Sequence, residues 1–238
     1  MALPKIAVPE FKAIIPSTKE EVFFRPFLVR EEKLLLMALE GNDQAEITNA
    51  VVNILTNCVK LDENRIKNLP SFDIEYLFLQ LRARSVNNVA KLSLRHRDDN
   101  ECKHVTEYEL NLEEVNAIFP EGHDNKIMLT DDVGVVMKYP SITGLDKAQE
   151  KLSDSNVENI LRFFSENIAI IFDKDDVHEN NTKEELMEFV EQLSSKQFNK
   201  LANFYKTMPY VGHEIKYTCT ECGKEEFIPL RGLNSFFM

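Results

Sequence analysis

Apolar residues recur along this chain with two spacings, one typical of helices and the other of strands. From Ile47 to Cys58 they fall three and four positions apart, which indicates an amphipathic helix with one buried face. In Val89–Leu94 and Val105–Leu112 they alternate with polar residues, as in a pair of half-buried strands. The pattern therefore predicts a protein that combines helices with antiparallel hairpins.

Two more helices are predicted in the N-terminal part of the chain. One opens at Arg30 and ends at the polar stop formed by residues 41–43. The other, Ile74–Arg84, is apolar around most of its circumference. A helix of this kind belongs in the centre of a fold or against a partner.

The C-terminal part is helical and acidic by the same criteria. Residues 146–195 hold 13 acidic and 5 basic side chains. One apolar stripe runs over Val157–Ile171, and a capping box at Thr182–Glu185 begins a helix whose buried face is Leu186–Leu193. A further helix is predicted around Phe198–Tyr205.

The predicted fold class is α+β, mainly helical with small antiparallel β-hairpins or a small sheet and a C-terminal zinc-knuckle-like hairpin. We expect three segments: an N-terminal hairpin with a helical part at 1–88, a small antiparallel β region at 89–145, and an acidic helical part with the C-terminal hairpin at 146–238. All three can also form one compact domain. The other predicted hairpins join Phe11–Ile15 to Val22–Leu28, Ile127–Leu129 to Val133–Tyr139, and Glu214–Thr218 to Glu226–Leu230.

Charge and composition narrow the classes of function. The chain has 28 basic and 40 acidic residues, a net charge of −12, which disfavours binding to the phosphates of nucleic acid. No run of 18 apolar residues is present, so we expect neither a membrane-spanning helix nor a membrane partner. The N-terminal residues do not resemble a secretory signal, and only 4 cysteines are present, so a reducing compartment is expected.

The sharpest chemical signal is the pair Cys219 and Cys222, followed by Gly223, between two strand-like runs. Two thiolates three positions apart on a tight turn can face one metal ion, but structural zinc needs four ligands. Cys102 and His104, in the connection of another hairpin, are the expected remaining ligands, and His96 lies on the other flank of that connection. The alternative is that both turns are plain hairpins that hold no metal.

No catalytic motif is present. The sequence has no phosphate-binding glycine loop, no H-E-x-x-H and no G-x-S-x-G. Carboxylate groups at 131–132 and 173–176 suggest divalent-metal hydrolysis at first sight, but acidic turns are usually only solvated. Arg82, Arg84, Arg95 and Arg97 form a local basic cluster, which either docks an acidic partner or pairs with the chain's own carboxylates.

Three stretches resemble the T-even-type bacteriophage baseplate proteins: Val22–Ala38, Phe72–Ser85 and the closing Cys219–Phe237. The resemblance spans nearly the whole chain and contains no catalytic motif. It implies a non-enzymatic tail protein, either a baseplate hub subunit or an assembly factor or chaperone. Its expected partners are hub or tape-measure proteins, and its expected location is the cytoplasm of the infected host or the virion baseplate.

The residues themselves also favour an interaction protein. We expect the acidic helices Val157–Ile171 and Leu186–Leu193 to flank the partner surface, or else the surface to lie on the N-terminal hairpin. A protein-binding zinc-ribbon regulator is the alternative function. The partner-binding residues that we expect are Phe24, Phe27, Tyr76, Phe78, Arg82 and Arg84.

Overall fold

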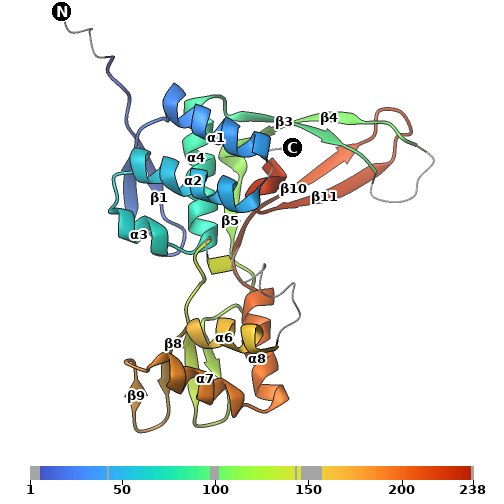
Figure 1. Cartoon of the computed structure of the whole chain (residues 1–238). Helices are drawn as coiled ribbons and strands as arrows, with labels where there is room; N and C mark the ends of the chain where they lie inside the picture. The colour runs from blue at the N-terminus through green and yellow to red at the C-terminus, as the bar shows by residue number, and fades with distance from the viewer. Residues whose placement is uncertain (1–5, 42, 97–101, 143, 146–156, 237–238) are drawn as a thin grey trace, which may run out of the picture. The chain divides into compact units, whose positions relative to one another are not determined.

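The computed structural model describes the chain except for residues 1–5, 42, 97–101, 143, 146–156 and 237–238. Helices alternate with small antiparallel sheets of two to four strands (Figure 1), which confirms the α+β class. Within the described residues, no helix is both long enough and apolar enough to cross a membrane.

The contacts group the chain into two compact units. The first comprises residues 1–118 and 210–238, and the second comprises residues 119–209. The first unit is therefore discontinuous in sequence, because the C-terminal strands return to it. That residues 1–88, 89–145 and 146–238 form separate segments stays a prediction.

The first unit contains the three helices predicted from the N-terminal sequence. The hairpin β1 (Phe11–Ile14) and β2 (Glu21–Phe24) precedes α1 (Val29–Gly41), α2 (Gln44–Cys58), α3 (Glu63–Asn68) and α4 (Ser71–Ser85). The predicted hairpin and the three predicted helices are confirmed, whereas the short α3 was not predicted. Asp43 explains one boundary, because its side chain caps α2 by accepting hydrogen bonds from the N–H groups of Ala45 and Glu46.

Helix α4 lies at the centre of the first unit. It contacts α2, the 3₁₀ turn η1 (Leu112–Glu114) and the strands β5 (Asn116–Ile118) and β10 (Tyr210–Thr218). Nine of its residues are buried, including Phe72 and Phe78, as its apolar circumference predicted. Within this chain the helix is therefore covered by the protein's own elements.

Two hairpins form the rest of the first unit. Strands β3 (Val89–Leu94) and β4 (Thr106–Asn111) make one, and β10 with β11 (Glu225–Arg231) makes the other. Strand β5 pairs with β10 to complete a three-stranded sheet, and the 3₁₀ turn η2 (Leu233–Phe236) follows β11. The two hairpins run side by side with their connections at the same end (Figure 1).

In its described residues, the second unit contains a four-stranded antiparallel sheet covered by helices. Its strands are ordered β6 (Lys126–Met128), β7 (Gly134–Met137), β8 (Ile168–Phe172) and β9 (Val177–His178). Helices α6 (Val157–Glu166), α7 (Lys183–Glu191) and α8 (Ser195–Lys206) pack against it. The core shared by sheet and helices includes Val135, Ile168, Phe164, Leu186, Val190 and Leu201.

Two expectations about this region were wrong. The stripe Val157–Ile171 is not one helix, because α6 ends at Glu166 and the β-branched run that follows pairs with β7 as a strand. The β region expected at 89–145 is not one sheet either, since β3 and β4 belong to the first unit and β6 and β7 to the second. The capping box at Thr182–Glu185 is confirmed.

Candidate metal centre

The two hairpins of the first unit face each other through alternate side chains. On β3, Ala90, Leu92 and Leu94 are buried while the residues between them are exposed. On β10, Ile215 and Tyr217 are buried in the same alternating manner. Because side chains of a strand alternate between its two faces, this pattern places one buried face on each hairpin.

Four metal-ligating side chains lie where the two buried faces reach the hairpin connections. His96 follows β3 two residues after Leu94, and Cys102 comes from the other side of the same connection. Cys219 and Cys222 come from the β10–β11 turn. One ligand atom from each residue lies within 4.8 Å of all the others.

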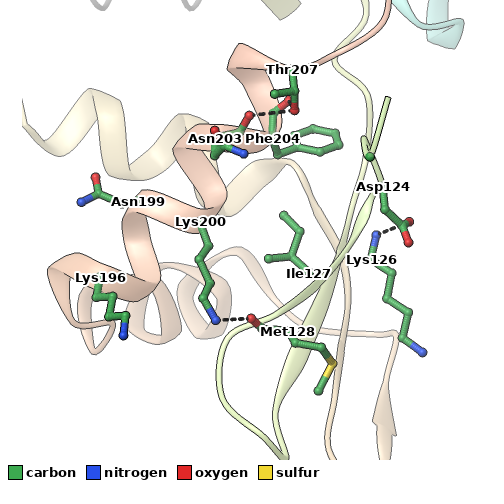
Figure 2. Close-up of a pocket in the computed structure, with 11 residues that line it drawn as sticks. Asp124, Lys126, Ile127, Met128, Lys196, Asn199, Lys200, Asn203, Phe204 and Thr207 are labelled. Atoms are coloured by element: carbon green, nitrogen blue, oxygen red, sulfur yellow. Dashed lines mark hydrogen bonds between the residues drawn. The ribbon is translucent and has the colours of Figure 1, made fainter. Parts of the chain in front are cut away.

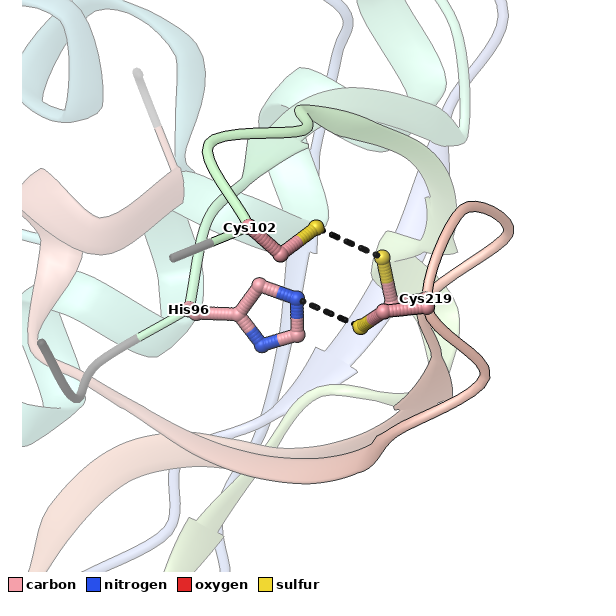
Figure 3. Close-up of side chains that lie close together, drawn as sticks. His96, Cys102 and Cys219 are labelled. Atoms are coloured by element: carbon pink, nitrogen blue, oxygen red, sulfur yellow. Dashed lines mark hydrogen bonds between the residues drawn. The ribbon is translucent and has the colours of Figure 1, made fainter. Parts of the chain in front are cut away.

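The individual distances describe a compact cluster of donors. The Sγ atoms of Cys102 and Cys219 are 3.9 Å apart, and the Sγ of Cys222 is 3.4 Å from Nε2 of His96. Figure 3 shows His96, Cys102 and Cys219 pointing toward one another from the two hairpins. This is the one group of three or more potential ligands found among the described residues, and its composition suits a metal ion.

The turn that carries Cys219 and Cys222 has the backbone of a metal knuckle. The N–H of Gly223 donates to the carbonyl of Cys219 at 2.9 Å, and the N–H of Cys219 donates to the carbonyl of Lys224 at 2.9 Å. Gly223 has a φ of 71°, a conformation that glycine adopts without steric cost. The local sequence therefore fixes two of the ligands by itself.

The fourth member of this group of potential ligands is not the histidine expected from the sequence. His104 was expected there, but its Nε2 is 2.9 Å from Oγ1 of Thr220, and it lies outside the cluster. His96 occupies the fourth position instead. The signal that favours it is the alternation on β3, because position 96 continues the buried series of Leu92 and Leu94.

A carboxylate lies behind the histidine of the cluster. Oε1 of Glu226 is 2.9 Å from Nδ1 of His96 and 3.0 Å from Nζ of Lys224. The side chains of His96 and Glu226 are only 2% and 10% exposed, so the pair is nearly closed to solvent. Beyond the strand alternation, no feature of the sequence indicates this pair.

The surroundings favour a thiolate at Cys219. A hydrogen bond from the N–H of Cys222, joined by one from the N–H of Glu221 and one from His96, lowers the pKa of the Cys219 thiol to about 6 against the opposing effect of burial. The hydrogen bond to Glu226 raises the pKa of His96 to about 9 in the chain without metal. A bound metal would therefore take the place of protons in this cluster.

The residues expected to bind a partner fall into two groups. Phe24, Phe27 and Phe78 are buried in the chain's own core, so they are not part of an accessible surface. Tyr76 is half-buried. In this fold the three phenylalanine side chains contact the protein's own core, so a partner-binding role for these aromatic residues stays a prediction.

The arginines of the expected basic cluster bind groups of the same chain. Nη1 of Arg82 donates to the carbonyl of Phe236 at 3.1 Å, and Arg84 forms a 2.7 Å ion pair with Glu113. Arg84 also lies over the ring of Phe11. Arg95 is exposed, and Arg97 lies outside the described residues. A partner-binding role for Arg82 and Arg84 stays a prediction.

The acidic turns have structural partners. The carboxylate of Asp173 accepts hydrogen bonds of 2.8 Å from the N–H groups of Asp175 and Asp176, which closes the β8–β9 turn. Asp132 pairs with Lys174. These contacts account for the carboxylates as turn-forming groups.

The second unit carries an open groove of about 590 Å³ between α8 and β6 (Figure 2). Nζ of Lys200 donates to the carbonyl of Met128 at 2.6 Å, and Asp124 accepts from the N–H of Lys126 at 2.9 Å. Its lining residues include no cysteine, histidine or serine.

The structure thus defines a class of protein: an α+β chain in which, among the described residues, one group of potential metal ligands lies between the connections of two hairpins. Comparison with known families makes this specific, because the model of the T4 bacteriophage base plate protein family matches residues 8–238. The chain belongs to this family. No curated protein and no solved structure matches it.

Proposed function

We propose that this chain is a non-enzymatic component of the baseplate hub, as a hub subunit or as an assembly factor that holds a hub or tape-measure protein. The observation that carries the proposal is the family match over residues 8–238. In this role the chain would act in the cytoplasm of the infected host during tail assembly and would reach the baseplate of the virion. It would turn over no substrate.

An exposed apolar stripe on α1 supports an interaction role. Leu34, Leu36 and Met37 are 48%, 53% and 57% exposed, while Leu35 and Ala38 face the core. Neighbouring exposed apolar side chains on one helix are typical of surfaces that a protein partner covers. The acidic faces of α6 and α7 are the other surface that we expect a partner to contact.

We also propose that the metal centre has a structural role. All four donors come from the chain, whereas a catalytic site keeps one coordination position for water or substrate. The centre lies at the ends of two hairpins, so a bound ion would hold their connections together. A rigid pair of hairpins would then be available for contacts within the baseplate.

Co-expression tests the hub role. We expect the full chain to co-purify as a complex of defined mass with one hub or tape-measure protein of its own phage. A double substitution L36S/M37S is expected to weaken that complex at least tenfold, because a partner would lose two apolar contacts. V177S, at a 63% exposed residue of the second unit, is the matched control.

Light scattering of the purified mixtures gives the mass of each complex. If the chain forms a complex with none of the hub and tape-measure proteins, the proposed role is wrong. If the complex forms but ignores both L36S/M37S and charge reversal at Glu184 and Glu188, the expected surfaces are wrong. Circular dichroism of each variant shows whether its fold is retained.

A further inference from the structure

We infer that His96, Cys102, Cys219 and Cys222 bind one zinc ion as a closed site of three sulfurs and one nitrogen, and that Glu226 positions His96 for it. This inference deepens the structural role proposed above for the metal centre. It replaces the ligand set expected from sequence, in which His104 was the nitrogen donor, and it adds a residue outside the ligand set.

The distances between donors fit a tetrahedral zinc ion. With zinc–sulfur bonds of about 2.3 Å and zinc–nitrogen bonds of about 2.0–2.1 Å, tetrahedral angles place two sulfurs about 3.8 Å apart and a sulfur and a nitrogen about 3.6 Å apart. The corresponding distances are 3.9 Å between Cys102 and Cys219 and 3.4 Å between Cys222 and His96. These two pairs of donors are therefore spaced for an ion between them, and all four donor atoms lie within 4.8 Å of one another.

The donor set selects the kind of metal. Thiolates are soft ligands that hard cations such as Mg²⁺ and Ca²⁺ avoid, and three of them with an imidazole form a common structural zinc site. Three thiolates and one Zn²⁺ leave a net charge of about −1, and the site lies beside Lys224. The donors come from both flanks of one hairpin connection and from the turn of the other hairpin, so a bound ion crosslinks the two hairpins.

Glu226 occupies a position that strand alternation assigns to an apolar residue. On β11 the inward-facing neighbours of Glu226 in the alternating series are Ile228 and Leu230, and Glu226 itself is only 8% exposed. A buried carboxylate is unfavourable unless it has partners. Its partners here are Nδ1 of His96 and Nζ of Lys224.

The contact with Glu226 sets the orientation of the imidazole. When Nδ1–H donates to the carboxylate, the lone pair of Nε2 is left facing the three sulfurs. Carboxylates placed in this way fix the tautomer and the ring orientation of zinc-bound histidines. Glu226 is thus a positioning residue that touches a ligand and not the ion.

The metal content of the full-length chain tests the ligand set. Native mass spectrometry of protein purified without added metal is expected to show one zinc per chain. H96N is expected to lower zinc affinity at least a hundredfold, whereas H104N, the matched control on the other flank of the connection, is expected to retain one zinc. Zinc retained in H96N and lost in H104N would overturn the assignment.

Cobalt substitution tests the geometry and the role of Glu226. We expect Co²⁺ to give the intense visible bands of a tetrahedral site and the near-ultraviolet bands of thiolate bonding, and Zn²⁺ to displace it. E226Q is expected to weaken zinc binding by about 10–100-fold in competition with a chelator while the tetrahedral spectrum is retained. E225Q, at the exposed neighbouring residue, is the control and is expected to leave the affinity unchanged.

The outcomes separate this inference from the proposed function. Octahedral cobalt spectra would overturn the tetrahedral zinc geometry. Equal zinc affinity in E226Q and E225Q would overturn the role of Glu226. Restored affinity in E226D supports positioning by the carboxylate. Co-purification with hub proteins is a separate readout, so its failure contradicts the hub role and leaves the metal result standing.

Discussion

Replacing Phe78 by alanine is expected to lower the free energy of unfolding by about 3–5 kcal/mol, because a fully buried aromatic ring leaves a cavity that its neighbours cannot fill. The side chain of Phe78 is 0% exposed and lies on α4, the helix that contacts α2, β5 and β10. Since the total stability of a domain is about 5–15 kcal/mol, this one substitution is expected to remove a large part of it. Urea denaturation measures the change.

F227A is the matched control for this prediction. Phe227 is 54% exposed and lies with its ring under Nζ of Lys216, so its removal is expected to cost less than about 1 kcal/mol. F78L keeps most of the buried volume and is expected to fall between wild type and F78A. If F78A unfolds at the wild-type urea concentration but loses hub binding, Phe78 is a surface residue and its assignment to the core is wrong.

Replacing Glu31 by glutamine is expected to destabilise the chain by about 3 kcal/mol at pH 7. Burial by itself would raise the pKa of Glu31, but hydrogen bonds from Arg25, Arg30 and the N–H of Leu28 outweigh it and lower the pKa to about 2. The carboxylate accepts these bonds at 3.0, 2.7 and 2.8 Å. Glutamine cannot carry the charge that the two arginines require.

The pH dependence of this effect has a definite sign. The pKa of Glu31 is lowered from 4.5 to about 2 in the folded chain, so the stability from its charge is present above pH 4.5 and is lost as pH falls toward 2. The difference in the free energy of unfolding between wild type and E31Q should therefore fall near pH 3 to about half of its value at pH 7. Burial raises the pKa of Asp73 to about 6, which acts in the opposite direction, but it is common to both proteins and cancels in the difference.

Urea denaturation of both proteins at pH 7, 4.5 and 3 checks this prediction. E32Q is the control, because Glu32 is only partly buried and follows Glu31 in the same turn of α1. Its unfolding free energy should stay within about 0.5 kcal/mol of wild type at each pH. If the difference in unfolding free energy between wild type and E31Q grows as pH falls, the charge of Glu31 does not stabilise the folded chain.

The fold could be predicted wherever a local rule fixed the structure. The apolar spacing of α2 and α4, the alternation of β3 and β4, and the capping box of Thr182 each depend on residues a few positions apart. Strand β8 could not be predicted in this way, because the spacing of its isoleucines also continues the stripe of α6. Pairing with β7 makes this segment a strand and not a continuation of the helix, and this pairing joins residues far apart in sequence.

The metal centre shows the same limit. The turn of Cys219 and Cys222 is local, so its two ligands could be predicted from spacing alone. The alternation of β3 favours His96 over His104, but whether this face of β3 meets the turn of Cys219 and Cys222 depends on how the two hairpins pack, which sequence spacing does not give. Glu226 was missed for the same reason, because its partner His96 is 130 positions away.

Hydrogen exchange with and without zinc gives the most direct test of the claim that a metal ion joins the two hairpins of this baseplate protein. On removal of zinc from the full-length chain, we expect amide protection to fall in β3, β4, β10 and β11 and to stay unchanged in residues 157–206 of the second unit. Protection that is identical with and without zinc in all four strands would contradict the account, as would an equal loss of protection throughout the second unit.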